Sequence, residues 1–120
     1  MIYQDLLGRP WRSPDASEPA DGLDCLDAVL EVLRRSGREV PTREGVVRGE
    51  LAMTKLGTSV AAAERVGDVI YTEPKDGKAA CVYVLVEPSQ GRALTSLHDQ
   101  GVSLVRLSAI PEPLTVWRCA

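Results

Sequence analysis

The spacing of apolar residues changes once along this chain, near Val66-Gly67, and this change limits the fold class. Before it, apolar residues recur at three- and four-residue steps, which indicates helices with one buried face. After it, short runs rich in Val, Leu and Ile alternate with turns that contain Gly or Pro, which is typical of strands. We therefore predict an α+β fold in which N-terminal helices pack on a meander of about five antiparallel strands. The 120 residues fit one domain that spans residues 1–120.

The clearest predicted helix begins after Asp24 and ends before Gly37. Asp is a residue type that caps helix N-termini, and Gly readily takes the left-handed conformation that ends a helix. The apolar stripe of this helix consists of Leu23, Leu26, Leu30 and Leu33. A looser period predicts a second helix over residues 42–56 and a short third turn over residues 59–65.

The remaining segments are predicted to be one long loop and a series of strands. Residues 6–22 are rich in Pro and Gly, so we expect an ordered surface loop there, pinned by Trp11. The Val-rich run over residues 81–86 is expected to be a strand buried on both faces. The other predicted strands cover residues 68–72, 92–97 and 114–117, with one more that starts at Gly101.

Charge and hydropathy exclude several classes of partner. The formal net charge is −3, and Lys and Arg are interspersed with Asp and Glu, so no basic stripe points to nucleic-acid binding. No apolar stretch approaches the roughly 20 residues of a membrane span. The N-terminus lacks the basic region and apolar run of a secretory signal peptide. We expect no membrane span and synthesis in the cytoplasm, followed by retention there or exit by a signal-independent route.

The cysteines and the histidine are too few and too far apart for a typical structural metal site. Cys25, Cys81 and Cys119 are widely spaced, and His98 is the only histidine. We therefore expect neither a bound metal nor a cofactor. The simplest interpretation is that the cysteines are reduced thiols that pack like small apolar side chains.

The segment Gly22-Leu23-Asp24-Cys25 is the one that most indicates chemistry. It places Cys25 in the first turn of the predicted helix, where the helix dipole and unpaired N–H groups favour a thiolate. The thiolate is the nucleophilic form, so Cys25 is a candidate catalytic nucleophile that needs a histidine base on a neighbouring strand. Taken alone, a cysteine at a helix start is more often a packing residue.

Several segments, in their order along the chain, resemble the NlpC family of cell-wall cysteine peptidases, which have a papain-like fold. They are Leu7 to Trp11, Gly22 to Cys25, Gly37 to Pro41, Gly67 to Ile70 and Val116 to Arg118. The resemblance covers residues 5–118 and is nearest to the short versions without signal peptides that are encoded in phage tail modules. Its best motifs are Gly22 to Cys25 and Gly67 to Ile70.

The resemblance implies a Cys–His site of which the histidine half is missing. Its strand after Gly67 to Ile70 should begin with the catalytic histidine, and the matching residue here is Cys81, or the neighbouring Ala80. The third position of the family's site falls on Thr95. His98 lies three residues further on, and such an offset along a strand turns a side chain to the opposite face. Cys25 therefore matches the nucleophile without a matching base.

Two other arrangements of these residues stay open. In one, a loop rearrangement brings His98 to Cys25 as its base. In the other, Cys25 and Cys81 face each other across the degenerate site and form a disulfide or hold a metal, although synthesis in the cytoplasm favours reduced thiols.

The resemblance leads to two functional hypotheses. The first is a non-catalytic structural or assembly component of a phage tail tip or related injection machine, made in the bacterial host cytoplasm and then carried in the virion tail. Its partners are other tail or assembly proteins in a symmetric complex, contacted through the Pro-rich loop and strand-edge loops. The second is an active endopeptidase or amidase on peptidoglycan peptides, with Cys25 as nucleophile. A third possibility is a small cytosolic binding domain without a phage context.

Overall fold

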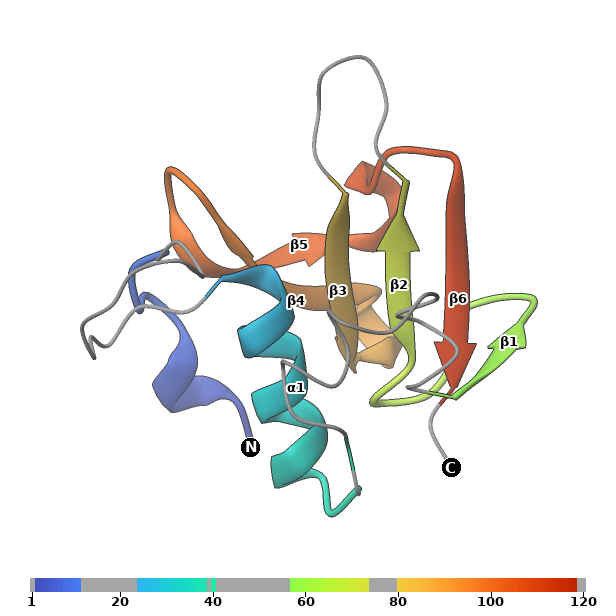
Figure 1. Cartoon of the computed structure of the whole chain (residues 1–120), viewed down its shortest axis with the longest axis horizontal. Coiled ribbons are helices and arrows are strands. Elements are labelled where there is room, and N and C mark those ends of the chain that lie inside the picture. Colours follow the sequence, from blue (N-terminus) through green and yellow to red (C-terminus); the bar gives the residue numbers. More distant parts are fainter. Residues whose placement is uncertain (1, 12–23, 39, 41–56, 74–79, 119–120) are drawn as a thin grey trace.

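The computed structural model describes residues 2–11, 24–38, 40, 57–73 and 80–118 (Figure 1). The predicted helix over residues 42–56, most of the Pro/Gly-rich loop and Cys119 lie outside these residues.

The described part consists of one α-helix, a six-stranded antiparallel sheet and short 3₁₀ turns, so the predicted α+β class is confirmed. The elements are η1 (Gln4–Leu6), α1 (Cys25–Arg35), β1 (Thr58–Val60), β2 (Val69–Thr72), β3 (Cys81–Glu87), η3 (Pro88–Gln90), β4 (Arg92–Leu97), β5 (Gly101–Arg106), η4 (Leu107–Ala109) and β6 (Leu114–Arg118).

The strands lie in the order β1-β6-β2-β3-β4-β5. The predicted meander holds for β2 to β5, but β6 returns to pair with the other side of β2. The prediction of a helical turn over residues 59–65 is wrong, because Thr58–Val60 pairs with β6 as an edge strand. The β-branched side chains of Thr58 and Val60 suit a strand, and the pairing partner is distant in sequence, which local periodicity cannot reveal.

Helix α1 begins and ends where its capping residues predict. The Asp24 side chain accepts a hydrogen bond from the Asp27 N–H at 2.8 Å, and Gly37 has a φ of 87° beyond the last turn. The helix packs against β3 and β4 (Figure 1). Its buried face is formed by Leu26, Ala28, Val29, Leu30, Val32 and Leu33.

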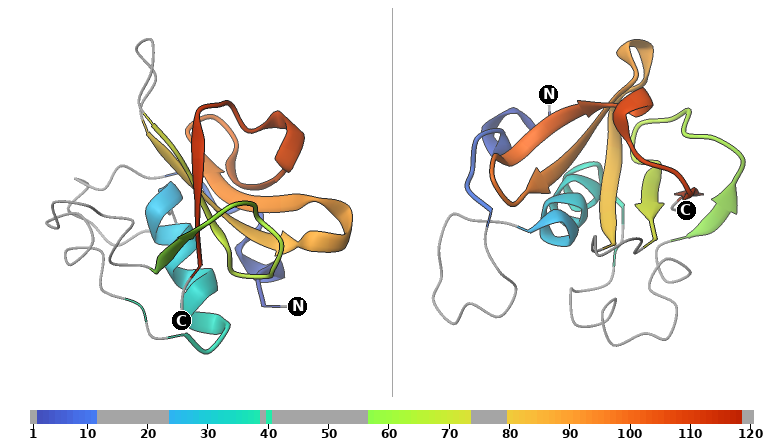
Figure 2. Two further views of the ribbon diagram at one scale, coloured as in Figure 1. Left: turned by 90° about the vertical axis from the view of Figure 1, so that its right-hand side faces the viewer. Right: turned by 90° about the horizontal axis from the view of Figure 1, so that it is seen from above.

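The core has two parts, one on each face of the sheet. One part joins α1 to alternate residues of β3, namely Val82, Val84 and Val86. The other gathers Ile70, Tyr83, Ala93, Ile110 and Val116. All residues from 82 to 86 are buried, which confirms the prediction of a strand covered on both faces. Seen from above, α1 lies beside β3 and β1 lies at the far edge (Figure 2).

Strands β3 and β4 pair over only part of their lengths. The register runs from Glu87↔Arg92, through a bulge, to Val84↔Leu94 and goes no further. By contrast β2 pairs with β3 as far as Thr72↔Cys81, and β4 pairs with β5 as far as Leu97↔Gly101. In Figure 1, β4 and β5 accordingly run across the upright β2, β3 and β6. The start of β3 therefore diverges from the end of β4, and this divergence positions the candidate site.

Candidate functional site

The candidate site centres on Cys25 in α1 and Cys81 in β3, two elements that pack against each other. Each is the first residue of its element. Both side chains are half-buried free thiols, and each affects the pKa of the other. The resemblance predicts these two residues at the nucleophile and histidine positions, and they lie close enough to shift each other's pKa.

Hydroxyl groups surround the Cys81 sulfur on its strand side. The Oγ1 of Thr95 lies 3.6 Å from Cys81 Sγ, and the nearby Tyr83 hydroxyl also lowers the pKa of the thiol. The Thr72 hydroxyl accepts from the Cys81 backbone N–H at 3.2 Å and so fixes the start of β3. The third position predicted from the resemblance, Thr95, therefore lies beside Cys81.

Thr95 also bridges the divergent strands. Its hydroxyl donates to the Val82 carbonyl at 2.7 Å, beyond the last residue pair of β3 and β4. A hydroxyl has one proton, so while Thr95 donates to this carbonyl it can only accept from a Cys81 thiol. If Cys81 is a thiolate, the hydroxyl can instead turn its proton toward the sulfur. Thr95 is thus both a structural bridge and an adjustable partner of Cys81.

The two thiols have opposite pKa shifts. The hydrogen bond from Cys25 lowers the pKa of Cys81 to about 6, against the effect of burial, and the Thr95 and Tyr83 hydroxyls act in the same direction. The pKa of Cys25 is raised, because its proton is held by Cys81, because it is buried and because the charges of Cys81 and Asp24 oppose a second thiolate. The directions of the two shifts therefore favour a thiolate at Cys81 over one at Cys25.

This distribution differs from the expected helix-activated thiolate at Cys25. The helix N-terminus already has an anion, since the Asp24 carboxylate accepts the Asp27 N–H. A thiolate on the adjacent residue would add a second negative charge next to the first. The N-cap that makes α1 start at Cys25 thus reduces the benefit that the helix dipole gives this thiol.

His98 lies elsewhere, in the exposed turn after β4. Its ring packs on Trp11, with ring centroids 4.6 Å apart and planes at 54°. Trp11 in turn follows the segment that pairs with β5, where Gly8 N–H donates to the Val102 carbonyl at 2.9 Å. The histidine therefore helps to hold the N-terminal segment on the sheet edge.

Tyr83 is the site residue that sequence reasoning missed. It follows Cys81 by two positions on β3, so strand alternation alone places both side chains on the same face. The two-residue alternation of side chains along a strand was therefore the sequence signal that could have identified Tyr83. The Tyr83 pKa is raised by burial and by the negative charge of the neighbouring sulfur.

A second polar cluster surrounds Asp68 in the Gly67 to Ile70 motif. Asp68 is fully buried, and Arg118 donates to its two carboxylate oxygens from Nε at 2.9 Å and Nη2 at 2.8 Å. The backbone N–H groups of Glu64 and Arg65 donate to the same carboxylate at 2.9 and 3.0 Å. Burial raises the Asp68 pKa, but these donors outweigh it and bring the pKa to about 2.

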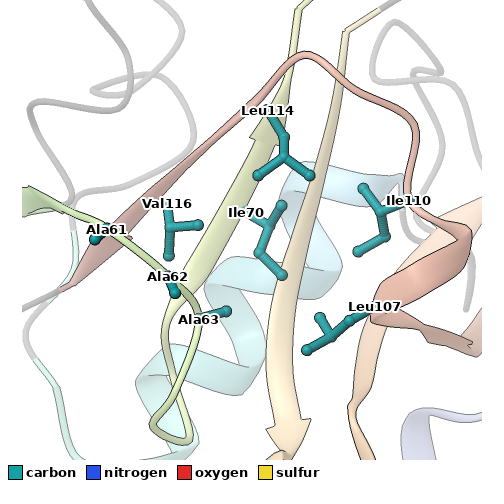
Figure 3. Close-up of a pocket in the computed structure, with 8 residues that line it drawn as sticks. All are labelled: Ala61, Ala62, Ala63, Ile70, Leu107, Ile110, Leu114 and Val116. Atoms are coloured by element: carbon teal, nitrogen blue, oxygen red, sulfur yellow. The ribbon is translucent and has the colours of Figure 1, made fainter.

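An apolar cavity of about 250 Å³ lies on the sheet face opposite α1 (Figure 3). Its walls come from the loop after β1, from β2 and β6, and from η4 and the residue after it. The lining residues are Ala61, Ala62, Ala63, Ile70, Leu107, Ile110, Leu114 and Val116. All of these lining residues are apolar, and Cys81 packs against the same buried cluster that forms the floor of the cavity.

Within the described ranges, no three His, Cys, Asp or Glu side chains gather as a metal site would require. In the same part of the chain, no helix is long and apolar enough to cross a membrane. Comparison of the sequence with models of known families and with curated proteins finds no match.

Proposed function

We propose that this chain is a non-catalytic domain of the papain-like, NlpC type, in which a thiol pair stands where the peptidase family has cysteine and histidine. The observation that supports the proposal is that Cys25 and Cys81 shift each other's pKa and that Thr95 Oγ1 lies 3.6 Å from Cys81 Sγ. A first helical turn that meets divergent strands is the arrangement in which such a peptidase would hold its nucleophile and base.

The chemistry of the pair argues against peptidase activity. Cys25 has a raised pKa, so little of it is the nucleophilic thiolate near neutral pH. No imidazole accompanies it, since His98 packs on Trp11. Amide hydrolysis also needs a group that protonates the departing amine, and general acid–base help typically contributes 10²–10⁴-fold. A thiolate at Cys81 holds no proton to donate.

The biological setting that we propose is a structural or assembly component of a phage tail tip or related injection machine. A fold can be retained as a packing module after its chemistry is lost. In this setting the chain works among other tail proteins in a symmetric assembly. This part of the proposal rests on the resemblance of the sequence motifs to tail-associated members of the NlpC family.

The competing hypothesis is an active endopeptidase or amidase on peptidoglycan peptides, with Cys25 as nucleophile. It requires His98, or a residue from a partner, to reach Cys25 as the base. For this to happen, the His98 ring would have to leave Trp11, and the turn after β4 that carries His98 would have to rearrange.

The decisive variant is Cys81→His, which restores an imidazole at the position beside Cys25. If Cys81 occupies the base position, the imidazole should activate the Cys25 thiol, and alkylation of Cys25 at pH 7 should rise about tenfold or more. Cys81→Ser, which is close in size and has no base, is the matched control and should not activate Cys25. Equal alkylation of Cys25 in the two folded variants would contradict the proposed correspondence of positions.

Incubation of the unaltered protein with peptidoglycan stem peptides tests the lack of activity. We expect mass spectrometry to find no cleavage product. Cleavage that disappears in Cys25→Ser would overturn the proposal in favour of the peptidase.

A further inference from the structure

We propose that the apolar cavity on the sheet face opposite α1 is a binding site for a small, uncharged, apolar molecule of about ten non-hydrogen atoms. The proposal rests on the volume, the lining and the accessibility of the cavity. It uses neither the thiol site nor the resemblance to a peptidase family. It therefore holds or fails independently of the proposed non-catalytic role.

The cavity has a buried floor and a rim that solvent reaches (Figure 3). Ile70 of β2 and Val116 of β6 are paired residues of the sheet and form adjacent parts of the floor, and Ile110 adjoins them after η4. All three side chains are buried. At the rim, Ala62 is exposed and Leu114 is 36% exposed. A small molecule can therefore enter from solvent without a rearrangement of the strands.

The cavity is preformed, because its loop wall is fixed at both ends. This wall consists of three consecutive alanines, Ala61 to Ala63, whose short side chains leave the space open. Before them, β1 pairs with β6 up to Val60. After them, the backbone N–H groups of Glu64 and Arg65 donate to the buried Asp68 carboxylate. The loop is thus held away from the floor and does not collapse onto it.

The lining selects an uncharged ligand. All the lining residues are apolar, so a charged group that entered would lose its hydration without gaining a partner. Water also binds poorly in apolar cavities, and an engineered apolar cavity of about 150 Å³ binds benzene. The cavity here, about 250 Å³, is larger than that but smaller than the roughly 300–1,000 Å³ of sites for drug-sized ligands. It therefore suits a single ring system or a short hydrocarbon chain.

The surroundings of the cavity favour a free small molecule over a docked protein. The large apolar side chains that are exposed in the described part of the chain are Leu7, Val66 and Leu114, and of these only Leu114 lines the cavity. The exposed residues Glu64 and Glu112 adjoin lining segments in sequence. A stable protein interface buries about 800 Å² on each partner around an apolar centre. An isolated hollow in a polar surface instead buries a ligand that fits inside it.

The test is a titration of the full chain with toluene, followed by NMR of its methyl groups. We expect saturable shifts at the methyl groups of Ile70, Ile110, Leu114 and Val116, with a dissociation constant below about 1 mM. Benzoate and benzylammonium have the same ring with a charge added, and they should bind at least tenfold more weakly. No saturable shift with toluene would overturn the proposal.

Other occupants of the cavity give different results. N-acetyl-leucine amide mimics a leucine side chain on a partner protein. Shifts at the same methyl groups with this compound and none with toluene would overturn the proposal in favour of a protein ligand. Shifts on dilution of the protein alone, together with a dimer in sedimentation, would place a second copy over the cavity and would also overturn it.

Two variants locate the site. Ala63→Leu fills the cavity from its loop wall and should weaken toluene binding at least tenfold, whereas Ala109→Leu adds the same side chain at an exposed position of η4 outside the lining. Leu114→Thr makes the rim polar with a residue that suits a strand, and it should weaken binding several-fold. Unfolding midpoints show which variants are folded. Unchanged toluene binding in folded Ala63→Leu or Leu114→Thr protein would overturn the assignment of the site.

Discussion

The two ends of the β2–β3 pair hold two polar clusters with opposite properties. At one end, the buried carboxylate of Asp68 has a full set of complementary donors from Arg118 and two backbone N–H groups. At the other end, the thiols of Cys25 and Cys81 shift each other's pKa in opposite directions and remain partly exposed. Both clusters join segments that are distant in sequence.

The difference indicates which cluster serves the fold and which serves reactivity. A buried charge with all its partners in place resists change, because removing one partner leaves the other uncompensated. A partly exposed thiol pair can lose its proton, be alkylated or be oxidised without dismantling the core. We therefore expect substitutions at Asp68 to change stability strongly and substitutions at the thiol site to change reactivity strongly.

The largest effect is expected for Asp68→Asn. The variant removes the negative charge that faces Arg118 inside the protein, and we expect a loss of about 3 kcal/mol in the free energy of unfolding. Urea unfolding followed by circular dichroism measures it. Asp5→Asn is the matched control, because Asp5 also pairs with an arginine, Arg35, but is exposed at the surface. The control should hardly move the midpoint, and similar losses in both variants would break the comparison.

Acid should remove the contribution of Asp68. Its pKa of about 2 in the folded protein lies below the value of about 3.9 for an unfolded Asp, so folding favours the ionised form. The contribution is complete above about pH 4 and disappears as the pH falls through 2, which amounts to about 2–3 kcal/mol. Urea unfolding at pH values from 2 to 6 measures this slope. The Asp68→Asn protein should lose this part of the slope, and an unchanged slope would contradict the assignment.

A smaller effect on stability is expected for Thr95→Val, which keeps the shape of the side chain but removes its hydroxyl. The Val82 carbonyl loses its donor, at a cost of about 1–2 kcal/mol. The Cys81 pKa should rise, because a hydroxyl that stabilises the thiolate is gone. Thiolate absorbance during a pH titration of the Cys119→Ser protein measures the pKa. Ser103→Ala on β5 is the control, since its hydroxyl bonds the nearby Gly101 carbonyl and should leave Cys81 unaffected.

Local sequence signals predicted the elements whose limits are set locally. Asp24 and Gly37 bound α1 as expected, and the predicted strand over residues 92–97 coincides with β4. The edge strand β1 was missed because its three residues are ordered by pairing with β6, far away in sequence. The same reason explains why the Gly67 to Ile70 motif did not reveal Arg118 as the partner of its aspartate.

The candidate site shows the same division between local and distant information. The assignment of Cys25, Cys81 and Thr95 to the nucleophile, base and third positions stays a prediction from the resemblance, and strand alternation would have added Tyr83. The opposite pKa shifts of the two thiols could not be predicted, because they depend on how close Cys25 and Cys81 lie and on the carboxylate of Asp24. A cysteine at a helix start indicates a thiolate only if no other anion already caps that helix.

The most direct test of the central claim is to determine which cysteine iodoacetamide labels first at pH 6 in the Cys119→Ser protein. With a pKa of about 6, about half of Cys81 is thiolate there, against about 0.3% for an ordinary thiol of pKa 8.5. The lower nucleophilicity of such a thiolate offsets about tenfold of this advantage, so Cys81 should react about tenfold faster than an unfolded thiol. Peptide mapping after partial labelling should therefore find the label on Cys81, with Cys25 unlabelled. Label on Cys25 first would contradict the account and indicate an activated nucleophile at the helix start.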